Sequence, residues 1–158
     1  MEIRRAKVDD IEQIKKLIDI NFDEVIAKYH SPHVVSKFKN HNTVESLKSQ
    51  LNWKKIFVAD DGGCIVGTGA FVNFGTKDLP KFSISNLYVL PNLHGKGIGT
   101  QLITVLFAAA KEIDASFFHV PSSKNAIPFY EHYGFVVDEI QLETEDEITW
   151  MTMPLYYK

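Results

Sequence analysis

The sequence has one cysteine, no long apolar run and no excess of basic residues, and each shortage excludes a class of protein. A single cysteine, Cys64, rules out an internal disulfide framework. No apolar stretch approaches the ~20 residues that a membrane-spanning helix needs, so we expect no association with a membrane. The net charge of -3 argues against a nucleic-acid binder, which normally presents a basic face.

The start of the chain and its cysteine give two further expectations. Residues 1–7 are charged and lead directly into an amphipathic pattern, which predicts no signal peptide and therefore a cytoplasmic protein. Cys64 stands beside Ile65 and Val66 in an apolar, strand-like pattern. We therefore interpret it as a small buried hydrophobe rather than as a reactive thiol.

The sequence does contain enough apolar material for one packed domain. Of its 158 residues, 45% are hydrophobic and 23% are charged, and it has no repeat, low-complexity tract or linker. Residues 1–158 are therefore expected to form a single domain. Alternating or continuous apolar patterns predict strands at residues 2–5, 56–59, 64–74, 82–90, 117–120, 135–142 and 148–155. Helical spacing predicts helices from about residue 11, in pieces between 22 and 51, from about residue 97, and over 126–133.

This order of elements indicates an α/β domain with a mixed sheet. Asp9 or Asp10 is expected to cap the first helix, and Thr43 to begin a fresh helix after a polar break. Gly67 and Gly69, which lie inside a predicted strand, indicate a bulge or a closely packed neighbour.

The most informative segment is a glycine-rich stretch between a predicted strand and a predicted helix. It reads Leu87-Tyr88-Val89-Leu90-Pro91-Asn92-Leu93-His94-Gly95-Lys96-Gly97-Ile98-Gly99-Thr100. Three alternate glycines beside a helix start direct several backbone N–H groups into one concavity, where side chains would block an approaching anion. The helix dipole adds roughly half a positive charge there, and His94 and Lys96 can add more. The loop is therefore predicted to bind the diphosphate of a cofactor.

Three other interpretations of this loop compete with that one. A plain connecting loop rarely needs three glycines in five residues. A P-loop needs Ser or Thr directly after Gly95-Lys96, where Gly97 stands. A dinucleotide fingerprint needs a glycine at position 100, where Thr100 stands. Both nucleotide motifs therefore fit poorly.

The pattern that fits is the acyl-CoA loop of the GCN5-related N-acetyltransferases (GNAT), Gln/Arg-x-x-Gly-x-Gly/Ala, which the segment from His94 to Gly99 resembles. The approach Leu87-Tyr88-Val89-Leu90-Pro91 resembles the strand before that family's loop. A second segment resembles the family's second signature, Asn-x-x-Ala-x-x-Phe-Tyr-x-x-x-Gly-Phe in outline, and reads Asn125-Ala126-Ile127-Pro128-Phe129-Tyr130-Glu131-His132-Tyr133-Gly134-Phe135. The order of elements resembles the family over nearly the whole chain. One departure is His94 in place of Gln or Arg, from which we expect weaker or pH-sensitive binding.

The resemblance implies a fold and a cosubstrate. The implied fold is a single-domain, GNAT-like α/β structure whose mixed, mostly antiparallel sheet is flanked by helices and has a splayed central strand pair. The implied cosubstrate is acetyl-CoA, without a metal, and backbone groups near Leu87 and Val89 would hold its pantetheine arm and polarise the thioester. The residues expected to bind it are Leu87, Tyr88, Val89, His94, Gly95, Lys96, Gly97, Ile98, Gly99, Thr100, Asn125 and Tyr130.

Tyr130 matches the position of the family's usual catalytic acid. A phenol with a pKa near 10 can protonate a thiolate whose conjugate acid has a pKa near ~8.5, provided that the transfer accompanies bond breaking. The alternative is that Tyr130 only packs its ring under the cofactor. Asn125 matches the position that hydrogen-bonds the cofactor arm, and it can also cap its helix.

The sequence does not identify the general base. Many relatives carry Glu on the strand before the loop, where this chain has Asn86, which cannot accept a proton but can order a water. His119 and His33 are candidates, although a lone histidine is more often structural. A small fraction of the amine can also arrive already neutral.

Two segments bear on the acceptor. Residues 29–53, where the family varies with its acceptor, show no signature. The acidic cluster Glu143, Glu145, Asp146 and Glu147 would either attract a cationic amine or form a solvated turn, and we favour the turn. The terminal strands offer an edge through which a homodimer can pair.

The favoured function is acetyl transfer from acetyl-CoA to a primary amine of a small molecule or peptide, by direct attack on the thioester. A non-catalytic acyl-CoA sensor on the same fold is the alternative, and Asn86 in place of Glu keeps it open. A nucleotide-binding enzyme of another fold is the third hypothesis. Ligand-dependent melting with CoA, ATP or NAD separates the third hypothesis from the first two.

Overall fold

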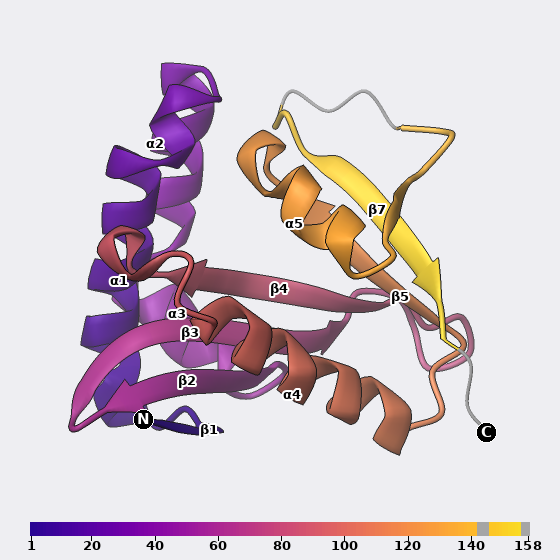
Figure 1. Cartoon of the computed structure of the whole chain (residues 1–158), viewed down its shortest axis with the longest axis horizontal. Coiled ribbons are helices and arrows are strands. Elements are labelled where there is room, and N and C mark those ends of the chain that lie inside the picture. The colour runs from indigo at the N-terminus through magenta and orange to yellow at the C-terminus, as the bar shows by residue number, and fades with distance from the viewer. Residues whose placement is uncertain (142–145, 156–158) are drawn as a thin grey trace.

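The computed structural model describes residues 1–141 and 146–155 and contains one seven-stranded sheet (Figure 1). The strand order is β1-β2-β3-β4-β5-β7-β6, and every neighbouring pair is antiparallel except β4 and β5. The strands are β1 (Glu2–Arg5), β2 (Lys55–Asp61), β3 (Cys64–Asn73), β4 (Phe82–Val89), β5 (Phe117–Ser122), β6 (Val136–Val137) and β7 (Thr149–Pro154). The helices are α1 (Ile11–Glu24), α2 (Pro32–His41), α3 (Val44–Gln50), α4 (Ile98–Glu112) and α5 (Ile127–His132), with 3₁₀ turns η1 (Val8–Asp10), η2 (Ile26–Lys28), η3 (Pro91–Leu93) and η4 (Lys124–Ala126). The predicted mixed, mostly antiparallel α/β fold is confirmed.

Helices cover both faces of the sheet, so the central strands are buried on both sides. Alternate residues of β2 point to opposite faces: Ile56 and Val58 pack against α1, and Ala59 packs with Ile98 and Leu102 of α4. Figure 1 shows α1 and α2 standing together at one end of the molecule, with α4 crossing β2 and β3. Within the described residues no helix has the length and apolar character needed to span a membrane.

The first helix begins where the sequence predicts, although its cap differs. The apolar residues that define its core face, Ile11, Ile14 and Leu17, are fully buried. Asp10 holds the N-cap position, but its carboxylate accepts a hydrogen bond from the backbone N–H of Lys7 at 2.7 Å instead of from the helix. It also pairs with the guanidinium of Arg4 at 2.8 Å, which ties the start of α1 to β1.

The predicted break after α2 is also present. Thr43 is the N-cap of α3, and its Oγ1 accepts a hydrogen bond from the backbone N–H of Ser46 at 3.1 Å. Helices α2 and α3 both lie within residues 29–53, the segment in which the sequence shows no functional signature.

Gly67 and Gly69 allow α4 to lie directly on the backbone of β3. A Cβ atom at Gly67 would stand 2.9 Å from Leu102 Cδ1 and 3.1 Å from Ile98 Cγ2. A Cβ at Gly69 would stand 3.3 Å from Leu106 Cδ1. The pairing of β3 with β4 also shifts between Thr68 and Ala70, so the sequence pattern was right on both counts, the bulge and the close neighbour.

Strands β4 and β5 separate soon after they meet. Their only paired residues are Ser83 and His119, and Figure 1 shows the two strands running apart toward their C-terminal ends. Asn86 in β4 adopts a left-handed backbone conformation, with φ of 53°, opposite the shift in β3. The expected splayed strand pair is therefore present, and β4 has a bulge at Asn86, beyond the point where the strands separate.

Two predictions were wrong in part. Cys64 is exposed, because it is the first residue of β3 and faces Asp61 beyond an irregularity at the end of the β2–β3 pair. The predicted strand over 135–142 is reduced to β6. Beyond β6, the side-chain amide of Gln141 takes the place of backbone pairing with β7. It donates to the carbonyl oxygen of Trp150 at 2.9 Å and accepts a hydrogen bond from the Trp150 N–H at 3.0 Å. Residues 142–145 lie outside the described part of the chain.

The contact between α4 and β3 predicts a stability effect. Gly67→Val should lower the free energy of unfolding by about 1–3 kcal/mol, because a Cβ and two methyl groups must enter a space that the ends of Leu102 and Ile98 already fill. Urea unfolding measures this. The control is Cys64→Ala, an exposed change in the same strand, for which we expect a difference within about 0.5 kcal/mol. Equal unfolding midpoints for the two variants would contradict the close packing of α4 on β3.

Candidate active site

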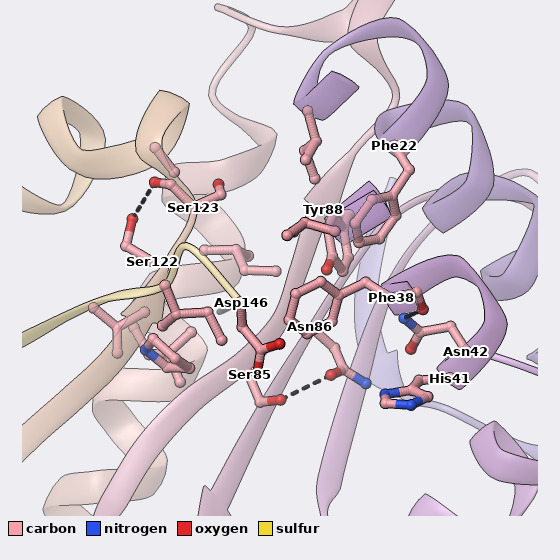
Figure 2. Close-up of a pocket in the computed structure, with 18 of the residues that line it drawn as sticks. Phe22, Phe38, His41, Asn42, Ser85, Asn86, Tyr88, Ser122, Ser123 and Asp146 are labelled. Carbon is pink, nitrogen blue, oxygen red and sulfur yellow. Dashed lines mark hydrogen bonds between the residues drawn. The ribbon is translucent and has the colours of Figure 1, made fainter. Parts of the chain in front are cut away.

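Two cavities meet at β4, one on each side of the splayed strand pair. The first, which we name the loop-side groove, has a volume of about 710 Å³ and runs along η3, the start of α4 and α5. The second, the α3-side pocket, has a volume of about 700 Å³ and is lined by α2, α3, β4 and the end of β5 (Figure 2). Both are in the size range of small-molecule sites. The residues that line both cavities are Ile26, Leu87, Tyr88, Ser123, Ala126 and Tyr130.

The glycine loop forms an open cradle at the floor of the loop-side groove. Gly95 and Gly97 have φ of 80° and 83°, in the left-handed region, and Gly97 is the N-cap residue of α4. No atom lies within 4 Å of the place where a Cβ would stand on either glycine. The backbone at the start of this 15-residue helix therefore lies open to an anion, and the helix dipole favours negative charge there.

The polar side chains of the loop take different positions. Nε2 of His94 donates to the carbonyl oxygen of Val89 at 2.9 Å, so the imidazole folds back onto the end of β4 while still lining the groove. Thr100 shares a hydrogen bond of 2.6 Å with the hydroxyl of Tyr133, which joins α4 to the end of α5. Lys96 does not line the groove, and it is the only residue of the expected binding set that does not.

Asn125 supplies an acceptor that the protein itself leaves unused. Its Oδ1 is buried and has no hydrogen-bond partner among the described residues. Asn125 lines the loop-side groove. A buried carbonyl oxygen without a donor is costly, so this atom suits a ligand N–H such as an amide of a pantetheine arm. Together with the glycine cradle, it fits the CoA that the sequence predicts.

Two buried phenols lie at the boundary between the cavities. Burial raises the pKa of Tyr88 to about 12. Burial, with a smaller contribution from Tyr88, also raises the pKa of Tyr130 above its ordinary value. The Tyr130 hydroxyl forms no hydrogen bond within the described residues, so it is a protonated donor without a partner in the protein.

The α3-side pocket contains a polar chain that the sequence does not reveal. Lys54 Nζ donates to Ser85 Oγ at 3.0 Å and to Asn86 Oδ1 at 3.3 Å. The Ser85 hydroxyl donates to Asn86 Oδ1 at 2.8 Å, which Figure 2 shows as a dashed line. The Asn86 amide in turn donates to Gln50 Oε1 at 2.8 Å. Asn86 is therefore held inside a network and does not point freely at a substrate.

Neither candidate base lies in these cavities. His33 is exposed on α2, and His119 bonds Thr152 Oγ1 at 3.0 Å in the sheet. His30, which the sequence did not single out, lines the α3-side pocket, and its Nε2 accepts the backbone N–H of Lys124 at 3.0 Å. Burial lowers the pKa of His30, and its Nδ1 lies 3.4 Å from Glu147 Oε1. The Nε2 atom of His30 is thus engaged by the protein, whereas its Nδ1 has no hydrogen-bond partner among the described residues.

The described acidic residues of the last turn are held by specific partners. Glu147 accepts from the backbone N–H and the hydroxyl of Ser31, both at 2.9 Å. Asp146 pairs with Lys37 at 2.6 Å. Both carboxylates line the α3-side pocket, so a simple solvated turn is the wrong interpretation for these two residues. Glu143 and Glu145 lie outside the described residues.

Residues 26–157 match the acetyltransferase (GNAT) domain family. The chain belongs to the GNAT acetyltransferase family. A search of curated proteins found no significant match. Among solved structures, the GNAT chain is similar to the PaiA N-acetyltransferase of Thermoplasma acidophilum in complex with coenzyme A, with a TM-score of 0.82, 16% identity and 98% of each chain covered. It is also similar to a GNAT protein of Rhodopseudomonas palustris, with a TM-score of 0.80, 21% identity and coverage of 98% and 95%.

A third similar structure is a predicted acetyltransferase of Clostridium acetobutylicum with acetyl-CoA, with a TM-score of 0.70, 23% identity and coverage of 91% and 95%. These likenesses confirm the GNAT fold. Two of the three similar structures contain CoA or acetyl-CoA, which agrees with the cosubstrate expected for this family. No group of three or more possible metal ligands occurs among the described residues of this GNAT domain.

The unused acceptor of Asn125 predicts a measurable loss of affinity for CoA. Asn125→Ala should weaken CoA binding by roughly 5- to 10-fold, the effect of losing one hydrogen bond of about 1 kcal/mol. Isothermal titration with CoA measures the change. Gln101→Ala, on an exposed position of α4 outside the groove, is the control and should bind CoA as the unmodified GNAT domain does. Equal dissociation constants for both variants would remove Asn125 from the binding site.

Proposed function

We propose that the protein transfers an acetyl group from acetyl-CoA to a primary amine of a small molecule or peptide, by direct attack of the amine on the thioester. The main support for this proposal is that the two cavities share one stretch of β4, which consists of Leu87 and Tyr88. A cavity on each side of the splayed strands gives the donor and the acceptor separate entrances to a common boundary. Direct transfer requires the two substrates to be present together, and this arrangement allows it.

The loop-side groove is the proposed site of acetyl-CoA. Backbone groups of Gly95, Gly97 and Gly99 would hold the diphosphate, with the dipole of α4 behind them. Asn125 would accept a hydrogen bond from the pantetheine arm. Since β4 has no strand partner on its β5 side beyond Ser83 among the described residues, its free backbone groups can hold the arm and polarise the thioester carbonyl. Acetyl-CoA supplies the activated acyl group and a thiolate leaving group.

Tyr130 is the proposed general acid. The residue is buried, and it lines both cavities at their boundary, where the leaving sulfur must be protonated. The amine nitrogen forms the new bond to the acyl carbon as the carbon–sulfur bond breaks, and the proton that the amine loses restores the phenol. Because its pKa is raised above the ordinary value near 10, the phenol keeps its proton throughout the neutral and mildly alkaline range. At saturating acceptor concentration, kcat should therefore not decrease between neutral and mildly alkaline pH through deprotonation of Tyr130.

The role of Tyr130 gives a direct test. Tyr130→Phe keeps the ring but removes the proton, so kcat should fall by about 100-fold, at the lower end of general acid catalysis, with CoA affinity nearly unchanged. Thiol release measures kcat and titration measures CoA binding. Tyr88→Phe removes the other phenol at the same boundary and is the matched comparison. Full activity of Tyr130→Phe, or an equal loss in both variants, would reject Tyr130 as the specific acid.

The overall activity has its own test, which needs no variant. CoA and acetyl-CoA should raise the melting temperature, whereas ATP and NAD should not. Acetyl-CoA with a panel of primary amines should release CoA thiol. Stabilisation by CoA without release from any amine would favour the non-catalytic sensor. Stabilisation by ATP or NAD alone would reject the CoA site.

A further inference from the structure

We propose that Lys54 binds a carboxylate of the acceptor, so that the acceptor is an amine that also carries a carboxylate, as an amino acid or short peptide does. This inference rests on the function proposed above and narrows its substrate class. It arises from a buried cation in the α3-side pocket that has no opposite charge beside it among the residues the structure describes.

Lys54 is unusually buried for a lysine. Its exposed fraction is only 8%, although its side chain lines a cavity of about 700 Å³. The ammonium lies 4.9 Å from the ring centre of Trp53 and 5.7 Å from that of Phe74, so aromatic faces help to stabilise its charge. The packing holds the ammonium in one place, which a binding site requires.

The hydrogen-bond partners of Lys54 are neutral. An ammonium group has three N–H donors, and Ser85 and Asn86 accept two of them through uncharged oxygens. No carboxylate among the described residues pairs with Lys54, and burial is the only cause that lowers its pKa, to about 8. A buried charge is costly unless it is paired. The third donor and the missing counter-charge therefore suit an anionic group of a ligand.

The carboxylates of the same pocket do not compete for this role. Asp146 pairs with Lys37, and Glu147 is engaged by Ser31 and lies beside His30. The partners of these two carboxylates lie in or next to α2, so neither is paired with Lys54. Within the described part of the pocket, the ammonium of Lys54 therefore has no carboxylate partner. A substrate with a second cation, such as a diamine, would place like charge beside Lys54.

The position of Lys54 relative to the boundary suits an aminocarboxylate. The ammonium contacts Ser85 and Asn86 of β4, and the residues shared by both cavities begin at Leu87 and Tyr88. One to three residues of strand span up to about 10 Å. A molecule anchored by its carboxylate at Lys54 can therefore extend its amine along β4 toward the thioester.

The test compares matched acceptors that differ only in the group at the far end. Glycine, β-alanine, γ-aminobutyrate and ε-aminocaproate, with glycylglycine as a short peptide, form the carboxylate series. Amino alcohols and diamines of the same chain lengths form the neutral and cationic series. With the unmodified protein, the best carboxylate should exceed its amino alcohol in kcat/KM by roughly 10- to 100-fold, the effect of a charged hydrogen bond. The diamine should be the poorest.

Variants of Lys54 decide whether this side chain is responsible. Lys54→Met, of similar length and without charge, should remove the preference by raising KM for the carboxylate while leaving the amino alcohol nearly unchanged. Lys54→Arg should restore part of the preference. Lys48→Met, an exposed lysine of α3 outside the pocket, is the control and should behave as the unmodified protein.

A binding measurement separates failure of this inference from failure of the proposed function. With CoA present, ε-aminocaproate should stabilise the unmodified protein against heat, and it should not stabilise Lys54→Met. If no amine releases thiol, the proposed transfer is rejected, and this binding difference still decides the role of Lys54. Equal turnover of the matched series, equal losses for both series in Lys54→Met, or equal stabilisation of both proteins would overturn the inference.

Discussion

The separation of β4 from β5 is the constraint on which the rest of the site depends. The strands are paired only through Ser83 and His119, and the left-handed residue Asn86 bends β4 at the place where they part. Both cavities open beside this break, and Figure 2 shows the α3-side pocket. A continuous sheet would satisfy these backbone groups internally and leave no passage between the two faces. The unpaired strand edge is therefore the part of the fold that makes room for chemistry.

The two cavities differ in what builds them. The loop-side groove is made mostly of backbone geometry: two left-handed glycines, a helix start and a free strand edge. The α3-side pocket is made of side chains from α2, α3 and β4, and it carries the chain of hydrogen bonds that begins at Lys54. The first suits a ligand that is the same throughout a family, and the second suits one that differs between its members.

The sequence predicted the features that local chemistry determines. Glycine spacing identified the cradle, and Gly67 and Gly69 indicated the close approach of α4, because each needs a missing side chain. It did not predict Lys54, since nothing beside Trp53 shows that this lysine is buried by Phe74 and β4, which are distant in the chain. The prediction that Cys64 is buried was wrong for a related reason, because the exposure of this residue depends on where the β2–β3 hairpin ends.

The contact of α4 with the bare backbone of β3 has an effect beyond stability. Because Gly67 meets Ile98 and Leu102 at close range, the height of α4 above the sheet is set by β3, and so is the position of the loop amides at its start. The position of the glycine cradle is thus determined by a strand that contributes no residue to the groove. A substitution at Gly67 or Gly69 would therefore be expected to displace the loop as well as to weaken the packing of α4, although neither glycine touches the groove.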